Sequence, residues 1–293
     1  SAHCGSQPAG HHLHLPLQAE INISLLGLQH VVFCMLILSL FRQLQSPTNL
    51  LLLSLAVSDF LVGFFQMPTA TLLFRGCWIL SDFICIGTYV FGALILGASV
   101  GNMLLISIDR YMAICEPMLY CIRVTVKRVQ LCVCLCWIIS GVFSSWFHQN
   151  KSQPDKENAC LGECVYVGND VEDIVDLAVT FLGPILIIII LYLRVFVVAV
   201  SQARAMQIKA AVTLGIVVAV FLLCYCPYYC FAMASLKSQV KATSSALQLL
   251  LLYINSSLNP MIYAFFYPWF RKAIRHIVTL QILQPGSSQT RFK

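Results

Sequence analysis

The sequence predicts an all-α membrane protein: a bundle of seven transmembrane helices followed by a short amphipathic eighth helix. Of its 293 residues, 59% are hydrophobic and 10% are charged, whereas a soluble domain carries about 25% charged residues. The mean hydropathy is +0.83. The apolar residues fall into seven runs, each long enough to cross a bilayer as a helix, for which ~20 residues are needed. The runs are residues 24–41, 49–73, 84–107, 129–147, 171–200, 210–234 and 244–266.

These runs divide the chain into three parts. Residues 1–23 form an extracellular tail, 24–266 the transmembrane domain, and 267–293 an amphipathic helix with a cytoplasmic tail. Most of the 18 Lys and Arg residues fall on one side of the membrane if the N-terminus lies outside, as expected for cytoplasmic loops. The net charge of +6 therefore reflects membrane topology and not a nucleic-acid surface. We expect a multi-pass plasma-membrane protein that contacts lipid.

One acid lies at membrane depth in the second run. A lone carboxylate such as Asp59 costs a few kcal/mol in the bilayer and is a functional candidate for that reason. The alternative is a protonated, hydrogen-bonded structural residue. The acids near the outer ends of the helices have no nucleophile or metal-ligand set beside them, so we do not expect an enzyme.

The last apolar run ends in a segment, Asn255–Phe270, that reads NSSLNPMIYAFFYPWF. Pro260 frees a backbone carbonyl inside the membrane, and Asn255, Ser256 and Asn259 can compensate for it. The letters NPMIY resemble the NPxxY motif of rhodopsin-like G-protein-coupled receptors. The whole segment resembles the NSxxNPxxYxxxYxWF pattern of the trace amine-associated receptors.

A second motif supports this resemblance. Asp109-Arg110-Tyr111 at the end of the third run resembles the DRY motif of the same receptors. The resemblance implies that Asp109 holds Arg110 at rest and that the freed Arg110 contacts a heterotrimeric G protein of the stimulatory or olfactory type. The residues that the resemblance assigns to activation are Asp109, Arg110, Tyr111, Met118, Tyr192, Phe221, Tyr225, Asn259, Pro260 and Tyr263. Tyr225 stands where the family usually has tryptophan, and its hydroxyl needs a partner.

The resemblance also implies an ion site in the core of the bundle. Its side chains would hold a sodium ion with water: Asp59, Ser99, Asn255 and Asn259. The first run lacks the Gly-Asn pair that the family carries there. No other cofactor is expected.

The extracellular side is expected to be oxidising and glycosylated. The resemblance pairs Cys85 with Cys164 and Cys160 with Cys4, although Cys77 is also available for the second bridge. Two glycosylation sequons lie on this side, at Asn22 and Asn150.

The ligand site departs from the common amine-receptor pattern. Most amine receptors of this class hold the ligand ammonium with an Asp in the third helix, and Gly92 stands at that position, which leaves room on this wall. Some trace amine receptors use an Asp of the fifth helix, and Asp176 matches it.

No Lys or Arg occurs in the outer half of any predicted helix except Arg75, and an ionised carboxylate is costly there unless it is paired. A small cationic amine is the expected partner, although Asp176 could instead share a water-filled vestibule with Glu172. The predicted ligand site comprises Tyr89, Gly92, Glu172, Asp176, Thr180, Tyr228, Tyr229 and Tyr253.

The sequence therefore predicts an amine-sensing receptor of the trace amine and olfactory type that raises cyclic AMP. Because Glu172 lies one helical turn from Asp176, short diamines are expected to outcompete monoamines. An opsin is excluded because Tyr253 stands where the retinal lysine would be. The alternatives are a rhodopsin-like receptor for a peptide or lipid, or a divergent receptor that does not signal.

Overall fold

The computed structural model describes residues 46–69, 81–149, 170–201, 205–235, 255–256 and 258–259. These ranges are almost wholly helical, and no strand occurs in them. Two elements, η2 and η3, are π-helical turns inside longer helices. In chain order, the described elements are α2 (Pro47–Leu61), η2 (Val62–Gln66), α4 (Asp82–Cys115), α5 (Pro117–Arg123), α6 (Val126–Gln149), α7 (Asp170–Leu177), η3 (Ala178–Leu182), α8 (Gly183–Ser201) and α9 (Ala205–Ser235).

Four of the helical segments are long and apolar enough to cross a membrane. They are Pro47–Thr69, Phe83–Cys115, Val126–Phe147 and Ile174–Ser201, and they match the second to fifth predicted runs. The sixth run coincides with α9, which contains Pro227. The first run and most of the seventh lie outside the described residues, as do the 1–23 tail and the 267–293 segment with its predicted amphipathic helix.

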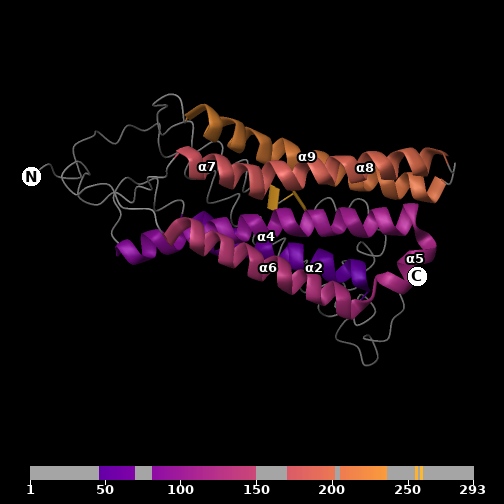
Figure 1. The fold of residues 1–293 in the computed structure, drawn as a ribbon, viewed down its shortest axis with the longest axis horizontal. Helices are drawn as coiled ribbons and strands as arrows, with labels where there is room; N and C mark the ends of the chain where they lie inside the picture. The colour runs from indigo at the N-terminus through magenta and orange to yellow at the C-terminus, as the bar shows by residue number, and fades with distance from the viewer. Residues whose placement is uncertain are drawn as a thin grey trace, which may run out of the picture.

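Helix α4 occupies the centre of the described bundle. Its 34 residues span about 51 Å at 1.5 Å per residue, which is more than the ~30 Å hydrocarbon core of a bilayer. It packs against α2, α6, α8 and α9, and it lies between α8 and α6 in Figure 1. Side chains on α4 can therefore contact every other described transmembrane helix.

Polar contacts join α2 to both α4 and α6. The Ser54 hydroxyl of α2 donates to Asn102 Oδ1 of α4 at 2.9 Å, and Trp137 Nε1 of α6 donates to Ser54 Oγ at 3.0 Å. All three helices thus meet at one hydroxyl. Because lipid offers no competing hydrogen bonds, such contacts help to fix which helices are neighbours.

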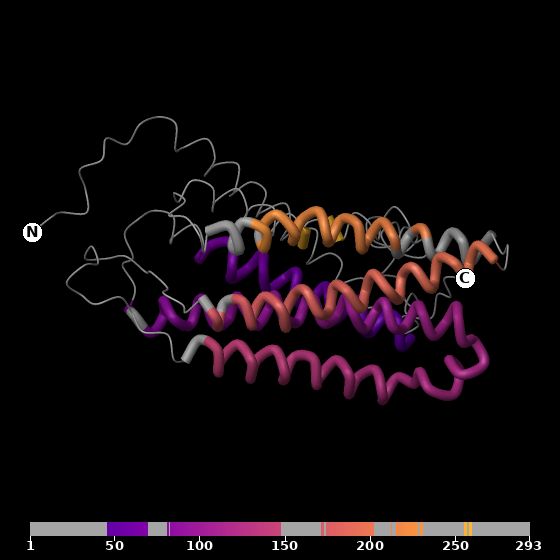
Figure 2. The backbone as a smooth tube through the Cα atoms, turned by 45° about the horizontal axis from the view of Figure 1, so that its top comes forward, coloured from indigo at the N-terminus to yellow at the C-terminus, as the bar shows by residue number. Residues whose placement is uncertain are grey.

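Local sequence signals explain the cytoplasmic helix ends. Ser46 caps α2 by accepting from the Asn49 amide, and Pro47 follows at the first helical position. After α4 ends at Cys115, Pro117 starts the short helix α5, and Figure 2 shows the chain turning through it into α6. Helix α8 ends at Ser201 and α9 begins at Ala205, so the connection between these two helices is short.

The outer faces of the bundle are apolar. On α8, the exposed side chains Leu186, Ile190, Leu193 and Val197 recur at three- and four-residue spacing, which forms one stripe of a helix. On α6, Leu131, Leu135, Ile138 and Val142 follow the same spacing. Stripes of this kind on spanning helices face lipid.

Candidate functional site

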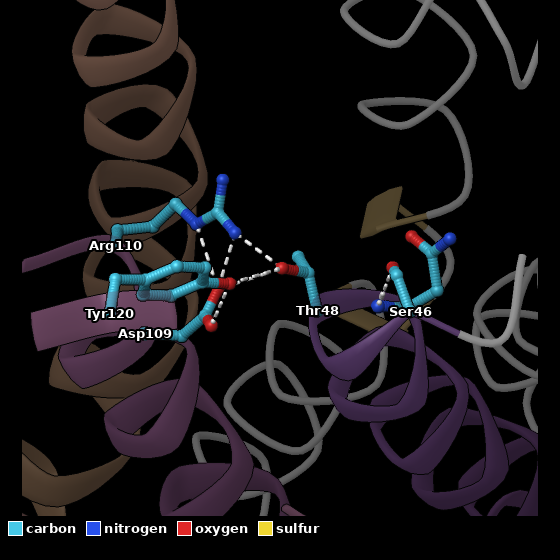
Figure 3. A network of polar contacts seen from close by, with 6 residues as sticks. Ser46, Thr48, Asp109, Arg110 and Tyr120 are labelled. Atoms are coloured by element: carbon cyan, nitrogen blue, oxygen red, sulfur yellow. Dashed lines mark hydrogen bonds and ion pairs between the residues drawn. The ribbon is translucent and has the colours of Figure 1, made fainter. Parts of the chain in front are cut away.

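The cytoplasmic end of the bundle contains a network around the Asp109 carboxylate (Figure 3). Arg110 forms an ion pair with Asp109, with its Nε 3.0 Å from Oδ2. Thr48 of α2 donates to the same oxygen at 2.9 Å, and Tyr120 of α5 donates to Oδ1 at 2.9 Å. Arg110 also donates to the Thr48 hydroxyl. Side chains from α2, α4 and α5 therefore meet on one carboxylate that is only 4% exposed.

Burial raises the pKa of the Tyr120 phenol. The phenol therefore keeps its proton at neutral pH and remains a donor to Asp109. The Thr48 hydroxyl donates to Asp109 and accepts from Arg110, so it uses both kinds of hydrogen bond that a hydroxyl has. This arrangement holds Arg110 against α4.

The neighbouring residues of the predicted activation set are also placed. Met118 lies on α5 with 86% of its surface exposed, and Tyr111 packs against the buried cluster of Ile114, Val195 and Ala199. On α8, Tyr192 lies against Gly215 of α9, where a Cβ would be 2.0 Å from its hydroxyl oxygen. Only a glycine admits the Tyr192 side chain in this position.

A buried polar cluster lies deeper in the bundle. Asn259 Nδ2 donates to Asp59 Oδ2 at 3.0 Å. The other Asp59 oxygen, the Ser99 hydroxyl and both polar atoms of the Asn255 side chain have no hydrogen-bond partner among the described residues. All four residues are at most 3% exposed. Buried polar atoms of this kind normally bind water or an ion.

The donor set of this cluster fits a hard cation. One carboxylate, one hydroxyl and two amide oxygens are oxygen ligands of the type that alkali and alkaline-earth ions prefer. Tyr225 of α9 lines the same cluster: it is 2% exposed, stacks on Phe221 with ring centroids 4.1 Å apart, and directs its hydroxyl toward Ser99 and Asn255. Tyr225, which stands where the family usually has tryptophan, therefore directs its hydroxyl at polar side chains.

The outer part of the bundle contains the predicted ligand residues of the fifth run. Asp176 and Glu172 are half-buried on α7. The Thr180 hydroxyl, on the π-helical turn η3, donates to the Asp176 backbone oxygen at 2.6 Å. Since a hydroxyl has one proton and two lone pairs, only its acceptor capacity remains for a ligand.

Two further predicted residues lie on α9 and α4. Tyr229 is 6% exposed and stacks on Phe181 of η3, with ring centroids 3.9 Å apart. One face of the Tyr229 ring thus packs on a residue that the sequence did not single out. Tyr89 is half-buried on α4.

The space beside Gly92 is filled, contrary to the sequence prediction of room on this wall. A Cβ at Gly92 would lie 2.2 Å from Nε2 of Gln66, the last residue of η2. The Gln66 amide occupies this space because Gly92 has no side chain. The only signal for it in the sequence was Gln66 itself, one of several polar residues in the apolar second run.

Several predicted residues lie outside the described part of the structure. Cys85 forms a disulfide, and every other cysteine in the described ranges is free, so its partner lies elsewhere and the pairing with Cys164 stays a prediction. The same holds for the second bridge between Cys160 and Cys4. The other predicted residues that lie outside the described part of the chain are Tyr253, Pro260, Tyr263, Asn22 and Asn150, together with the side chain of Tyr228.

The comparisons with known proteins agree with this bundle of membrane-spanning helices. Residues 31–263 match the family described as 7 transmembrane receptor (rhodopsin family). The fold is thus that of the rhodopsin-like receptors, a class of proteins that couple to G proteins and are not enzymes.

Curated relatives define the group more narrowly. The chain is 31% identical to trace amine-associated receptor 13c of Danio rerio, over 94% of this chain and 88% of the relative. It is 34% identical to receptor 7a and 35% identical to receptor 9 of Rattus norvegicus; each alignment covers 85% of this chain, with 78% and 82% of the relatives. The chain therefore belongs to the trace amine-associated receptor family of rhodopsin-like receptors, and it is a multi-pass protein of the plasma membrane.

Proposed function

We propose that this receptor detects small cationic amines by pairing their ammonium group with Asp176, and that it signals through a stimulatory G protein to cyclic AMP. The observation that carries the proposal is the half-buried Asp176 carboxyl group at the start of a transmembrane helix. An acid in this environment favours a cationic partner over solvent alone.

The hydroxyl next to Asp176 supports a ligand that donates hydrogen bonds. Thr180 uses its only proton on the Asp176 backbone oxygen, so it can accept from a ligand but cannot donate to one. An ammonium group has three donors and no acceptor. A carboxylate or phosphate ligand would meet the wrong charge at Asp176 and no hydroxyl donor at Thr180.

The absence of an acid at position 92 of α4 supports the choice of Asp176. Gly92 and the neutral Gln66 amide stand where amine receptors commonly have their anchor. The names of the relatives refer to trace amines, which are small cations at neutral pH. Asp176 is therefore the carboxylate that we assign to their ammonium group.

The cytoplasmic half supports coupling to a G protein. Arg110 is held by Asp109, Thr48 and Tyr120, and Met118 is exposed nearby on α5. Release of Arg110 would expose a cationic, hydrogen-bonding side chain next to an apolar one. The stimulatory type of G protein is inferred from the resemblance to the family.

We also propose that the central cluster binds a sodium ion. Asp59, Ser99, Asn255 and Asn259 would hold the ion through their side-chain oxygens, and the ion would neutralise the Asp59 carboxylate. Tyr225 would close the cluster toward α9. A buried carboxylate without such a partner is costly.

The test is a screen of the receptor, expressed at the cell surface, against panels of amines, peptides and lipids. Both cyclic AMP and recruitment of each class of G protein are recorded. Amines are expected to raise cyclic AMP, and Asp176→Ala is expected to abolish the response at unchanged surface expression. Amine-driven recruitment of another G protein would contradict the coupling only, whereas a response restricted to peptides or lipids would contradict the ligand class.

A further inference from the structure

The Gln66 side chain is an unassigned polar group on the wall of the ligand site. Its amide lies against the backbone of α4 at Gly92, with Nε2, Cδ and Oε1 at 2.2, 3.0 and 3.3 Å from the position that a Cβ would take there. Gly92 is the position at which amine receptors commonly carry their anchoring acid. A neutral amide from η2 thus occupies the space that a carboxylate side chain at position 92 of α4 would take.

The backbone around Gln66 is fixed by its neighbours. Phe65 makes an edge contact with Phe91 of α4, with ring centroids 5.3 Å apart. Met67, on the other side of Gln66, is buried in a cluster with Val62 and Ile95. Gln66 ends the π-helical turn η2, and such turns are frequent at functional sites because their extra residue redirects a side chain.

The Gln66 amide has hydrogen-bonding capacity that the described protein does not use. The residue is half-buried, and neither its Nε2 nor its Oε1 bonds any described side chain or backbone group. A glutamine amide provides two donors and one acceptor oxygen. A half-buried amide that bonds none of the described residues retains donors and an acceptor for a polar ligand group or water.

Helix α4 connects the two elements that carry the proposed ligand residues. Helix α4 contacts both η2, which carries Gln66, and η3, which carries Thr180. A ligand that lies across the outer part of α4 therefore has an acid and a lone-pair acceptor on one wall. On the other wall it meets a neutral group that both donates and accepts.

We propose that Gln66 binds the second polar end of the ligand and that this end is uncharged, so that the preferred ligands are amines with a distal hydroxyl or a similar neutral group. This inference rests on the proposed anchoring of the ammonium at Asp176. A hydroxyl can donate to Oε1 and accept from Nε2. A second ammonium could use only Oε1, and a neutral amide cannot balance its buried charge.

The proposal competes with the diamine preference that Glu172 suggests. In a diamine, the second ammonium would pair with Glu172 on the same helix as Asp176. In an amino alcohol, the hydroxyl would bind Gln66 on the opposite wall. The two arrangements predict opposite orders of potency for ligands of equal length.

The experiment compares straight-chain primary amines, amino alcohols and diamines of matched length on the full-length receptor, with surface expression measured in parallel. At the best chain length, the amino alcohol is expected to be about threefold to tenfold more potent than the alkylamine, which is the contribution of one neutral hydrogen bond. Gln66→Met keeps the length of the side chain but cannot form these bonds, and it is expected to bring the ratio of amino-alcohol to alkylamine potency close to one. Gln66→Glu is expected to shift the preference to the diamine.

Two glycine variants on α4 provide an independent test. Gly92→Ala places a Cβ 2.2 Å from the present position of Gln66 Nε2, which is too close for both atoms, so it displaces the amide and is expected to reduce the amino-alcohol advantage. Gly87→Ala is the matched control, because a Cβ at Gly87 meets nothing within 4 Å. Equal potency of amino alcohol and alkylamine at every length, or a diamine advantage on the unmodified receptor, would overturn the proposal. Alkylamine responses that survive Asp176→Ala would instead contradict the proposed anchor.

Discussion

Removing the Tyr120 hydroxyl tests whether the network around Asp109 restrains the receptor. Tyr120→Phe deletes the 2.9 Å bond to Asp109 Oδ1 and leaves the ring in place. A hydrogen bond to a charged group contributes about 1.5–3 kcal/mol, and the half-buried position of Tyr120 lets water recover part of this. We therefore expect a net loss of about 1 kcal/mol from the arrangement that holds Arg110, or a factor of about five in the equilibrium between resting and active receptor.

The assay is G-protein activation without ligand, normalised to the amount of receptor at the surface. If the active state is populated at a few per cent, basal activity is expected to rise about fivefold in Tyr120→Phe. Thr48→Val should raise it further, because the Thr48 hydroxyl bonds both Asp109 and Arg110. Ser107→Ala is the control, since the Ser107 hydroxyl bonds only the Met103 carbonyl of its own helix. Unchanged basal activity in both variants would refute the idea that these bonds restrain Arg110.

Three further predictions concern the same bundle. Arg110→Ala should abolish G-protein activation and leave amine binding intact, and signalling that persists in this variant would exclude Arg110 as the contact with the G protein. Replacing choline chloride by sodium chloride should lower agonist affinity by about fivefold or more if the central cluster binds sodium in the resting state, and Asp59→Asn should remove this dependence on sodium. Trp137→Phe removes the donor to Ser54 and should lower the free energy of unfolding by about 0.6–1 kcal/mol, the usual size of such bonds in membranes, measured as a lower Tm in detergent.

The transmembrane helices could be predicted from sequence because length and hydropathy determine them. The predicted runs 49–73, 129–147 and 171–200 coincide with described spans. Helix α4 is longer than its predicted run of 84–107 because it continues to Cys115 beyond the hydrocarbon region. Hydropathy reports the part of a helix that lies in lipid and not the part that extends into water.

The π-helical turns could not be predicted in this way. Five residues such as Val62–Gln66 or Ala178–Leu182 contain too few positions to distinguish a π turn from an α-helical one. Their consequences, the Gln66 amide at Gly92 and the Phe181 ring on Tyr229, therefore appear only in three dimensions.

Two hydrogen-bond partners of Asp109 could not be predicted either, because they are distant from it in the sequence or lie on another helix. Arg110 is its neighbour in a recognisable motif, but Thr48 is 61 residues away in the chain and Tyr120 is 11 residues away on a separate helix. The sequence alone does not show that a threonine at the start of one helix and a tyrosine between two apolar runs bind the same acid. Only the packing of α2 and α5 against the end of α4 shows that they share one carboxylate.

The binding of the ligand ammonium group by Asp176 is tested most directly by comparing the potency of the best amine on Asp176→Asn and on the unmodified receptor. Asparagine keeps the shape of the side chain and removes its charge. Loss of one partner from a buried charge pair costs about 2 kcal/mol or more, so amine potency is expected to fall about thirtyfold or more at equal surface expression. Asp176→Glu, which keeps the charge, should retain part of the response. Equal potency of the amine on the unmodified receptor and on Asp176→Asn would show that the ammonium group binds elsewhere.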